Sequence, residues 1–335
     1  MTRTNRDPGD DIPTPQEIYE RIDTTVGRVL IGNDDAIEQL TIAVLTGSHL
    51  LLEGVPGVAK TTMANLFARA SGLDYRRIQM TPDVLPADIV GTHVYREHTG
   101  EFELRRGPIF TNLIVADEIN RATPKTQSAL LEAMAENHVT IEGTTLELPD
   151  PFMVIATQNP IEMDGVFELP EAQRDRFQFK LTVDLPDRDV EAELLDRFDS
   201  DPNLGPSAID QVVDPAVLVS ARQQIYDVFV AEPVKQYILD LVSRTRIHPD
   251  VAHGASPRAS LTFLHGAKAR AAINGRNYVI PDDVKKLARS VLVHRLVLNT
   301  EADISDVRPA DVVADVIESV DVPDVQPRTD SASVS

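Results

Sequence analysis

The residues with the clearest chemical potential form a loop at 54–61, between a short apolar run at 50–52 and a helical pattern at 62–70. The loop has the sequence Gly54-Val55-Pro56-Gly57-Val58-Ala59-Lys60-Thr61. Backbone N–H groups at the start of a helix point toward anions, so such a loop can surround phosphate oxygens. In this pattern Lys60 reaches the β- and γ-phosphates and the Thr61 hydroxyl coordinates Mg²⁺. The spacing therefore predicts a site for ATP and magnesium, which extends to Thr62.

One position in this loop departs from the usual pattern, which has glycine before the lysine. Here that residue is Ala59. We expect a helical φ/ψ at this position, because that conformation tolerates one additional methyl group. The departure would then leave the phosphate-binding mechanism unchanged.

Acidic and amide side chains follow two further apolar runs. Asp117 and Glu118 end the run that starts at Leu113. Asp117 is predicted to hold magnesium directly or through water, and Glu118 to orient and polarise an attacking water. Another run, 152–156, is followed by Thr157-Gln158-Asn159-Pro160. Asn159 could reach between the γ-phosphate and Glu118, although an Asn-Pro pair by itself also indicates a turn.

The elements that position these residues follow from the spacing of apolar residues. Short apolar runs separated by helical patterns are typical of the buried strands of a parallel sheet. There are five such runs: 49–52, 75–79, 112–116, 152–156 and 177–182. The run 139–148, with Glu142-Gly143 near its centre, predicts a hairpin instead.

The composition divides the chain into five parts. The fold class we predict is α/β, a nucleotide-binding core with a parallel sheet followed by a small all-helical lid domain, with the nucleotide between the two. The parts are a flexible N-terminal arm at 1–15, the α/β core at 16–185, a linker around a short helix at 186–213, the lid and C-terminal helix at 214–319, and a disordered tail at 320–335.

The bulk composition limits the classes of partner. The formal net charge is −21, and a surface this acidic repels polyanions, so we expect no nucleic acid as partner. The sequence has no cysteine, no N-terminal apolar segment of a signal peptide and no apolar run long enough to span a bilayer. We therefore expect a cytoplasmic protein without membrane insertion. Many carboxylates and few lysines indicate a halophilic, archaeal type of sequence, with an ordinary acidic cytosolic protein as the alternative.

Several blocks together resemble the MoxR family of AAA+ ATPases. They are GVPGVAKT, LIVADEINRATPKTQSALLEAMAE, VIATQNP, LPEAQRDRF and GASPRASL, and the resemblance covers about residues 15–319. Ala59 also fits, because loops of this family often have Ala-Lys-Thr.

The resemblance implies roles for further residues. Asn159 matches sensor 1, Arg258 matches sensor 2, and Ile31-Gly32 matches the segment near the adenine. Arg176 matches the arginine finger that acts on a neighbouring subunit's γ-phosphate, and Arg174 is the alternative. The region 79–110 resembles the helix-2 insert, and the hairpin at 139–148 resembles the pre-sensor insertion. Arg121 faces the subunit boundary or simply caps a helix.

The resemblance also implies a function. A trans-acting arginine requires a ring, so we expect a homo-oligomer with six subunits as the expected number. The hydrolysis of ATP would drive a chaperone that remodels or activates partner complexes, together with von Willebrand factor A domain proteins. The alternatives are a magnesium-chelatase-like motor subunit, a motor directed to DNA or RNA, and a nucleotide-gated scaffold without hydrolysis.

Overall fold

Five strands from distant parts of the chain form one parallel sheet in the computed structural model, which describes residues 12–159 and 165–324. The strand order is β2-β5-β8-β1-β9. The strands are β1 (Leu50–Gly54), β2 (Tyr75–Gln79), β5 (Leu113–Asp117), β8 (Met153–Gln158) and β9 (Phe179–Val183). Each arises from one of the five predicted apolar runs, so the predicted α/β fold class is confirmed.

The three central strands β1, β5 and β8 are buried on both faces, which explains why they are largely apolar, whereas the edge strand β2 is polar and partly exposed. Alternate residues point to opposite faces. Leu50, Leu113 and Met153 belong to one apolar cluster, whereas Leu51, Ile114 and Val154 belong to the other. The first cluster includes helices α1 (Pro15–Val26), α2 (Asp34–Leu45) and α3 (Lys60–Ala70), and the second includes α4 (Pro86–Val90) and α5 (Pro124–Glu136).

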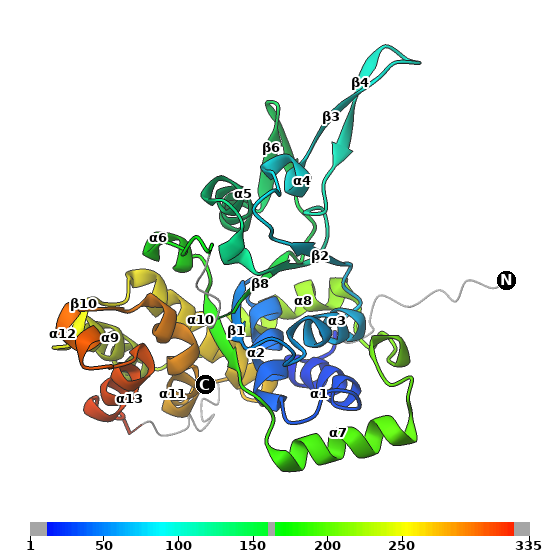
Figure 1. Ribbon diagram of the computed structural model, residues 1–335. Coiled ribbons are helices and arrows are strands. Elements are labelled where there is room, and N and C mark those ends of the chain that lie inside the picture. The colour runs from blue at the N-terminus through cyan, green and yellow to red at the C-terminus, as the bar shows by residue number, and fades with distance from the viewer. Residues whose placement is uncertain (1–11, 160–164, 325–335) are drawn as a thin grey trace, which may run out of the picture.

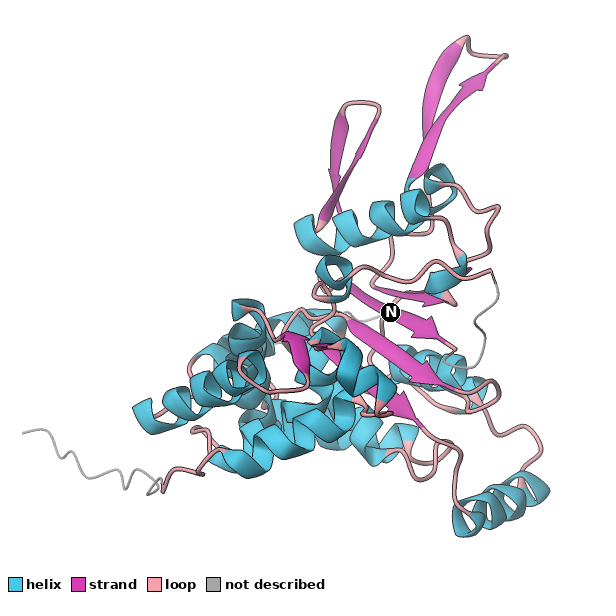
Figure 2. Ribbon diagram, turned by 60° about the vertical axis from the view of Figure 1, so that its left-hand side comes forward, coloured by secondary structure: helices cyan, strands magenta, loops and turns pink. Residues whose placement is uncertain are grey.

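Two hairpins project together from the same end of the core, as Figures 1 and 2 show. The first pairs β3 (Gly91–Arg96) with β4 (Glu101–Arg106), and the second pairs β6 (His138–Ile141) with β7 (Thr144–Glu147). Nδ1 of His93, near the base of the first hairpin, lies 3.2 Å from the carboxylate of Glu142, at the turn of the second hairpin. The second hairpin was predicted from the turn signal at Glu142-Gly143, where both residues have positive φ.

The remaining elements are mainly helical, and those after residue 231 lie beside the core (Figure 1). A two-stranded pair, β10 (Val251–His253) with β11 (Val297–Leu298), accompanies them. In chain order they are η1 (Ile119–Arg121), which follows β5, then α6 (Glu171–Arg174), α7 (Arg188–Ser200), η2 (Pro206–Ala208), α8 (Pro215–Tyr226), α9 (Glu232–Arg246), β10 (Val251–His253), α10 (Pro257–Ile273), α11 (Pro281–Leu292), η3 (Val293–Arg295), β11 (Val297–Leu298), α12 (Thr300–Ile304) and α13 (Pro309–Ser319).

Proline and a side-chain cap start several of these helices. Ser256 caps α10 before Pro257, because its hydroxyl accepts a hydrogen bond from the Arg258 N–H. Asp283 in α11 is fully buried between the guanidinium groups of Arg270 and Arg276. Arg270 also contacts Glu38 of α2 at 2.9 Å, so this charge network connects the helical part to the core.

Some predictions concern residues outside the described part of the chain. The flexible arm falls mostly within 1–11, Pro160 within 160–164, and most of the disordered tail within 325–335. The other domain limits stay predictions, although the presumed linker contains a 13-residue helix, α7. Within residues 12–159 and 165–324, every helix is too short or too polar to cross a bilayer.

Candidate nucleotide site

The phosphate-binding loop joins β1 to α3, as the strand-loop-helix pattern predicts. A Cβ atom on Gly54 would lie 2.5 Å from the Val183 carbonyl oxygen, so this position requires glycine. Gly57 has a φ of +91°, and a Cβ there would meet no atom within 4 Å. The backbone at Gly57 is therefore open to a ligand that approaches closely.

The expected helical conformation of Ala59 is wrong. Ala59 has φ 59° and ψ 23°, which is the left-handed region. An L-residue pays about 1–2 kcal/mol there, because Cβ approaches the following carbonyl. This conformation explains why glycine is usual at the position and places the start of α3 at Lys60.

The side chain of Lys60 turns back toward the first residue of the phosphate loop. Its Nζ donates to the Gly54 carbonyl and lies 3.4 Å from the Gln158 carbonyl oxygen, at the end of β8. Partial burial lowers the pKa of Lys60, and the negative charges of Asp117, Glu118 and Glu53 oppose that shift. The ammonium group therefore has a fixed position between β1 and β8.

The two acidic residues are held by a threonine that the sequence prediction missed. Thr157 is 1% exposed, and its hydroxyl donates to Oδ1 of Asp117. The same hydroxyl accepts a hydrogen bond of 2.9 Å from the Glu118 N–H. Glu118 itself has a φ of 58°, a left-handed conformation that a non-glycine residue adopts mainly where its surroundings enforce it. Thr157 thus fixes both the Asp117 carboxylate and the Glu118 backbone.

Side chains of β2 also contact both acids. Arg77 donates to Oδ2 of Asp117 from Nε and Nη2, at 2.9 and 2.6 Å, and its side chain is half exposed. Gln79 donates to the Glu118 carboxylate at 2.9 Å, and Arg121 lies 3.4 Å from the same oxygen. Arg77 and Gln79 were missed as well. Their spacing of two along a strand next to β5 was the available signal, since it places both on one face.

The residues present suit a magnesium ion. The Thr61 hydroxyl lies 3.5 Å from Oδ2 of Asp117, so two of the oxygen ligands that Mg²⁺ prefers are adjacent. Within the described ranges, no group of three or more His, Cys, Asp or Glu side chains could hold a metal ion. A site with few protein ligands is typical of Mg²⁺, which keeps waters and binds substrate phosphates.

A cavity of about 550 Å³ adjoins the loop. Ile31 and Gly32 line it together with Gly57, Val58, Ala59 and Thr62, so the structure brings the predicted adenine segment to the phosphate loop. Its opposite wall is formed by 181–187 and by Val190, Leu194 and Phe198. These three belong to α7. The cavity therefore lies between the core and α7, and a nucleotide position between the core and the helices after residue 214 stays a prediction.

The remaining predicted residues occupy three other places. Asn159 is buried directly after β8, at the same edge of the sheet as Asp117. Arg176 donates to the Leu131 carbonyl of α5 at 2.6 Å. Arg258 lies 3.9 Å from Asp175, one residue before Arg176, and neither arginine lines the 550 Å³ cavity. Arg174 lines a different cavity, beside Lys180 and Arg289.

Comparisons with known proteins agree with this arrangement. Residues 49–179 match the ATPase family associated with various cellular activities, and residues 243–316 match the AAA lid domain. Chaperone MoxR1 of Mycobacterium tuberculosis is 44% identical over 315 residues, which cover 91% of this chain and 82% of that protein. Protein MoxR of Methylorubrum extorquens is 30% identical over 93% of this chain and 96% of that protein.

A more distant relative is a magnesium-chelatase subunit ChlI homolog of Methanocaldococcus jannaschii, 28% identical over 55% of this chain and 50% of that protein. A crystal structure from Cytophaga hutchinsonii, whose protein carries a provisional ATPase assignment, is 39% identical and superposes with a TM-score of 0.85. The superposition covers 92% of this chain and 96% of that one. The phosphate loop, the paired acids and the similarity to these relatives show that the chain belongs to the MoxR family of AAA+ ATPases.

Proposed function

We propose that this chain hydrolyses ATP to ADP and phosphate with Mg²⁺ as cofactor. The observation that supports this most directly is the position of Thr157, which holds the Asp117 carboxylate and the Glu118 backbone beside the phosphate loop. Thr61 and Asp117 would hold the magnesium ion, which neutralises phosphate charge when it is bound. The carboxylate of Glu118 is then not needed as a ligand of the magnesium ion.

In the proposed reaction a water molecule attacks the γ-phosphate in line with the departing ADP. Glu118 orients this water, while Lys60 and Asn159 balance the negative charge that develops on the phosphate oxygens. Glu118 accepts a hydrogen bond from Gln79 and lies beside Arg121. Those contacts must therefore loosen before its carboxylate can turn toward water.

We further propose that the subunits assemble into a ring, with six as the expected number. Arg176 contacts its own α5 and lies outside the wall of its own 550 Å³ cavity. The family resemblance assigns an arginine at this position to a neighbouring subunit's γ-phosphate, and such an assignment requires a head-to-tail interface. Arg176 is our choice for this finger and Arg174 is the alternative.

The work of the ring would be to remodel or activate partner proteins in the cytoplasm, including von Willebrand factor A domain proteins. A relative with the name of chaperone supports the general class. The β3–β4 hairpin offers a contact surface, since the rings of Tyr95 and Phe102 lie 5.3 Å apart and both side chains are exposed. Purification from the native cell without such a partner would count against this part of the proposal.

The decisive experiment compares Glu118→Gln with wild type in high KCl, because the acidic surface is expected to need screening. Both proteins should bind Mg-ATP, and only wild type should release phosphate. Glu132→Gln, an exposed residue of α5, is the matched control and should turn over normally. Glu118→Gln that retains the wild-type rate would refute the assigned role of Glu118.

Three other functions remain as alternatives. ATPase activity that rises with added DNA or RNA would favour a nucleic-acid motor, against which the net charge of −21 argues. Stable ATP occupancy without phosphate release, at concentrations where rings form, would favour a nucleotide-gated scaffold. A magnesium-chelatase-like motor is supported by more distant relatives, which are 25–28% identical over 55% of this chain.

A further inference from the structure

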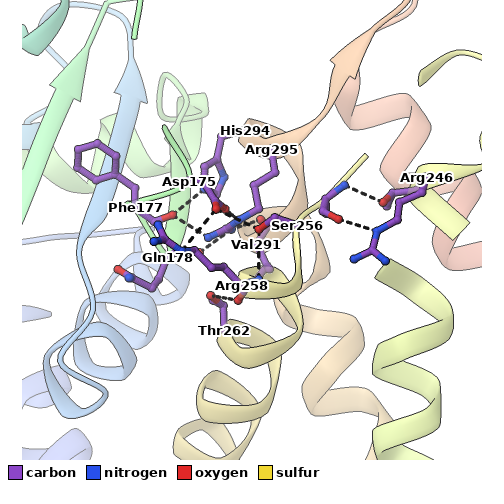
Figure 3. Close-up of polar contacts among 12 residues, drawn as sticks. Asp175, Phe177, Gln178, Arg246, Ser256, Arg258, Thr262, Val291, His294 and Arg295 are labelled. Atoms are coloured by element: carbon purple, nitrogen blue, oxygen red, sulfur yellow. Dashed lines mark hydrogen bonds and ion pairs between the residues drawn. The ribbon is translucent and has the colours of Figure 1, made fainter. Parts of the chain in front are cut away.

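A polar cluster joins the helical part of the chain to the segment that carries Arg176 (Figure 3). At its centre is Arg295, which is 3% exposed. Its Nε donates to Oδ1 of Asp175 at 2.8 Å. Its other nitrogens donate to the carbonyl oxygens of Gln178 at 3.0 Å and Phe177 at 2.9 Å. One buried guanidinium therefore holds both the side chain and the backbone of residues 175–178.

The second carboxylate oxygen of Asp175 faces α10. The Ser256 hydroxyl donates to Oδ2 at 3.0 Å, and Nε of Arg258 lies 3.9 Å from the same oxygen. Ser256 is also the cap of α10, so the start of that helix and Asp175 share one hydroxyl. In Figure 3 the side chains of Ser256, Arg258 and Arg295 converge on Asp175.

Charge explains why this carboxylate cannot be replaced freely. Asp175 is the ion-pair partner of Arg295, and a buried guanidinium is costly unless a carboxylate and hydrogen bonds compensate for its lost hydration. His294, the neighbour of Arg295, adds a contact of 2.9 Å between Nε2 and the Phe177 carbonyl oxygen. Residues 175–178 are therefore held from η3 and from α10 at once.

We propose that Asp175 is a positioning residue that locks the Arg176 segment to the helical part of the chain, so that Arg176 and Arg258 move as one unit. This inference rests on the proposed ring, in which Arg176 serves a neighbouring subunit's ATP. The contacts of Asp175 are with Arg295, Ser256 and Arg258, and it is not among the residues proposed to hold ATP or magnesium. Its effect is on where Arg176 lies when two subunits meet.

The first test is independent of activity. Hydrogen exchange is measured on full-length Asp175→Asn, on wild type and on Asp240→Asn, an exposed carboxylate of α9 that serves as the control. We expect the amides of 171–178 and the start of α10 to exchange at least about tenfold faster in Asp175→Asn, because Arg295 loses its charged partner. The loop at 54–61 should be unchanged. Equal exchange at 171–178 in all three proteins would overturn the proposal.

The second test asks whether the effect reaches the neighbouring subunit. Asp175→Asn alone should bind ATP as wild type does but hydrolyse it at least about tenfold more slowly, as expected for a displaced charge-stabilising group. It is then mixed in equal amounts with Lys60→Ala, which lacks the phosphate-binding lysine but has an intact Asp175. In randomly mixed rings, about a quarter of the interfaces place the intact phosphate loop of an Asp175→Asn subunit against the intact Arg176 segment of a Lys60→Ala subunit. Phosphate release should therefore exceed the sum of the separate rates.

Activity that merely equals that sum would place the role of Asp175 within its own subunit and overturn the proposal. Arg295→Lys keeps the positive charge but loses the planar fork, so it should fall between wild type and Asp175→Asn in both tests. If wild type itself neither assembles nor hydrolyses ATP, the proposed function fails. The exchange experiment still decides whether Asp175 locks the segment.

Discussion

Replacing Thr157 by valine should separate the binding of ATP from its hydrolysis. Valine has nearly the shape of threonine, but it lacks the hydroxyl that donates to Asp117 and accepts from the Glu118 N–H. A hydrogen bond to a charged group contributes about 1.5–3 kcal/mol, and a buried N–H left without a partner costs about 1–3 kcal/mol. Asp117 keeps its contact with Arg77. The two contributions together predict that the free energy of unfolding falls by about 2.5–6 kcal/mol.

The catalytic effect of this substitution should be larger than its effect on binding. Without the hydroxyl, the left-handed backbone of Glu118 loses one restraint, and a displacement on the order of 1 Å can slow a reaction about a hundredfold. Lys60 and the loop backbone are untouched, so the Kd for ATP should change little. Urea unfolding, equilibrium binding and phosphate release at saturating ATP measure the three quantities. Thr157→Ser keeps the hydroxyl and is the control. A valine variant with wild-type kcat would refute the reasoning.

Three further predictions concern single residues. Ala59→Gly should raise the free energy of unfolding by up to about 1 kcal/mol, because glycine adopts a positive φ without the steric cost of Cβ; a decrease in urea unfolding would contradict this. Asp283→Ala should lower the free energy of unfolding by about 3–5 kcal/mol, since two guanidinium groups lose their buried partner. Asp282→Ala, at an exposed site, should have little effect, and equal effects of the two substitutions would contradict the role of Asp283 as the buried partner. Burial lowers the pKa of His49 to about 4, so the unfolded chain, with a histidine pKa of 6.5, binds the proton more readily. Stability should then fall as the pH drops from about 6.5 to 4, by up to about 3 kcal/mol from this residue. Urea unfolding measured across that range should show that the free energy of unfolding depends less steeply on pH in His49→Gln than in wild type. An equal pH dependence would contradict a lowered pKa of His49.

Much of the architecture could be predicted because its signals are local. A run such as Leu50 to Leu52 indicates a buried strand without knowledge of its partners, and Ser256-Pro257 indicates the start of a helix. The phosphate loop and the pair Asp117-Glu118 were predictable for the same reason, since each lies within a few consecutive residues.

The missed residues depend on contacts between distant parts of the chain. Thr157 meets Asp117 only because β8 lies next to β5, and Arg295 meets Asp175 across 120 residues. No periodicity reports such pairs. The predicted conformation of Ala59 was wrong for another reason. Its positive φ follows from how the loop enters α3, and an alanine gives no sequence signal for positive φ.

The position of β1 in the sheet has a consequence for synthesis of the protein on the ribosome. Leu50 pairs with Ile155 on one side and with Phe179 on the other, so both neighbours of β1 are made more than about a hundred residues later. At a translation rate of about 5–20 residues per second, β8 is synthesised roughly 5–20 s after β1. A nascent chain that stops before residue 153 would contain the complete phosphate loop but neither strand beside it. ATP could therefore assist folding of the core only after most of the core has been translated.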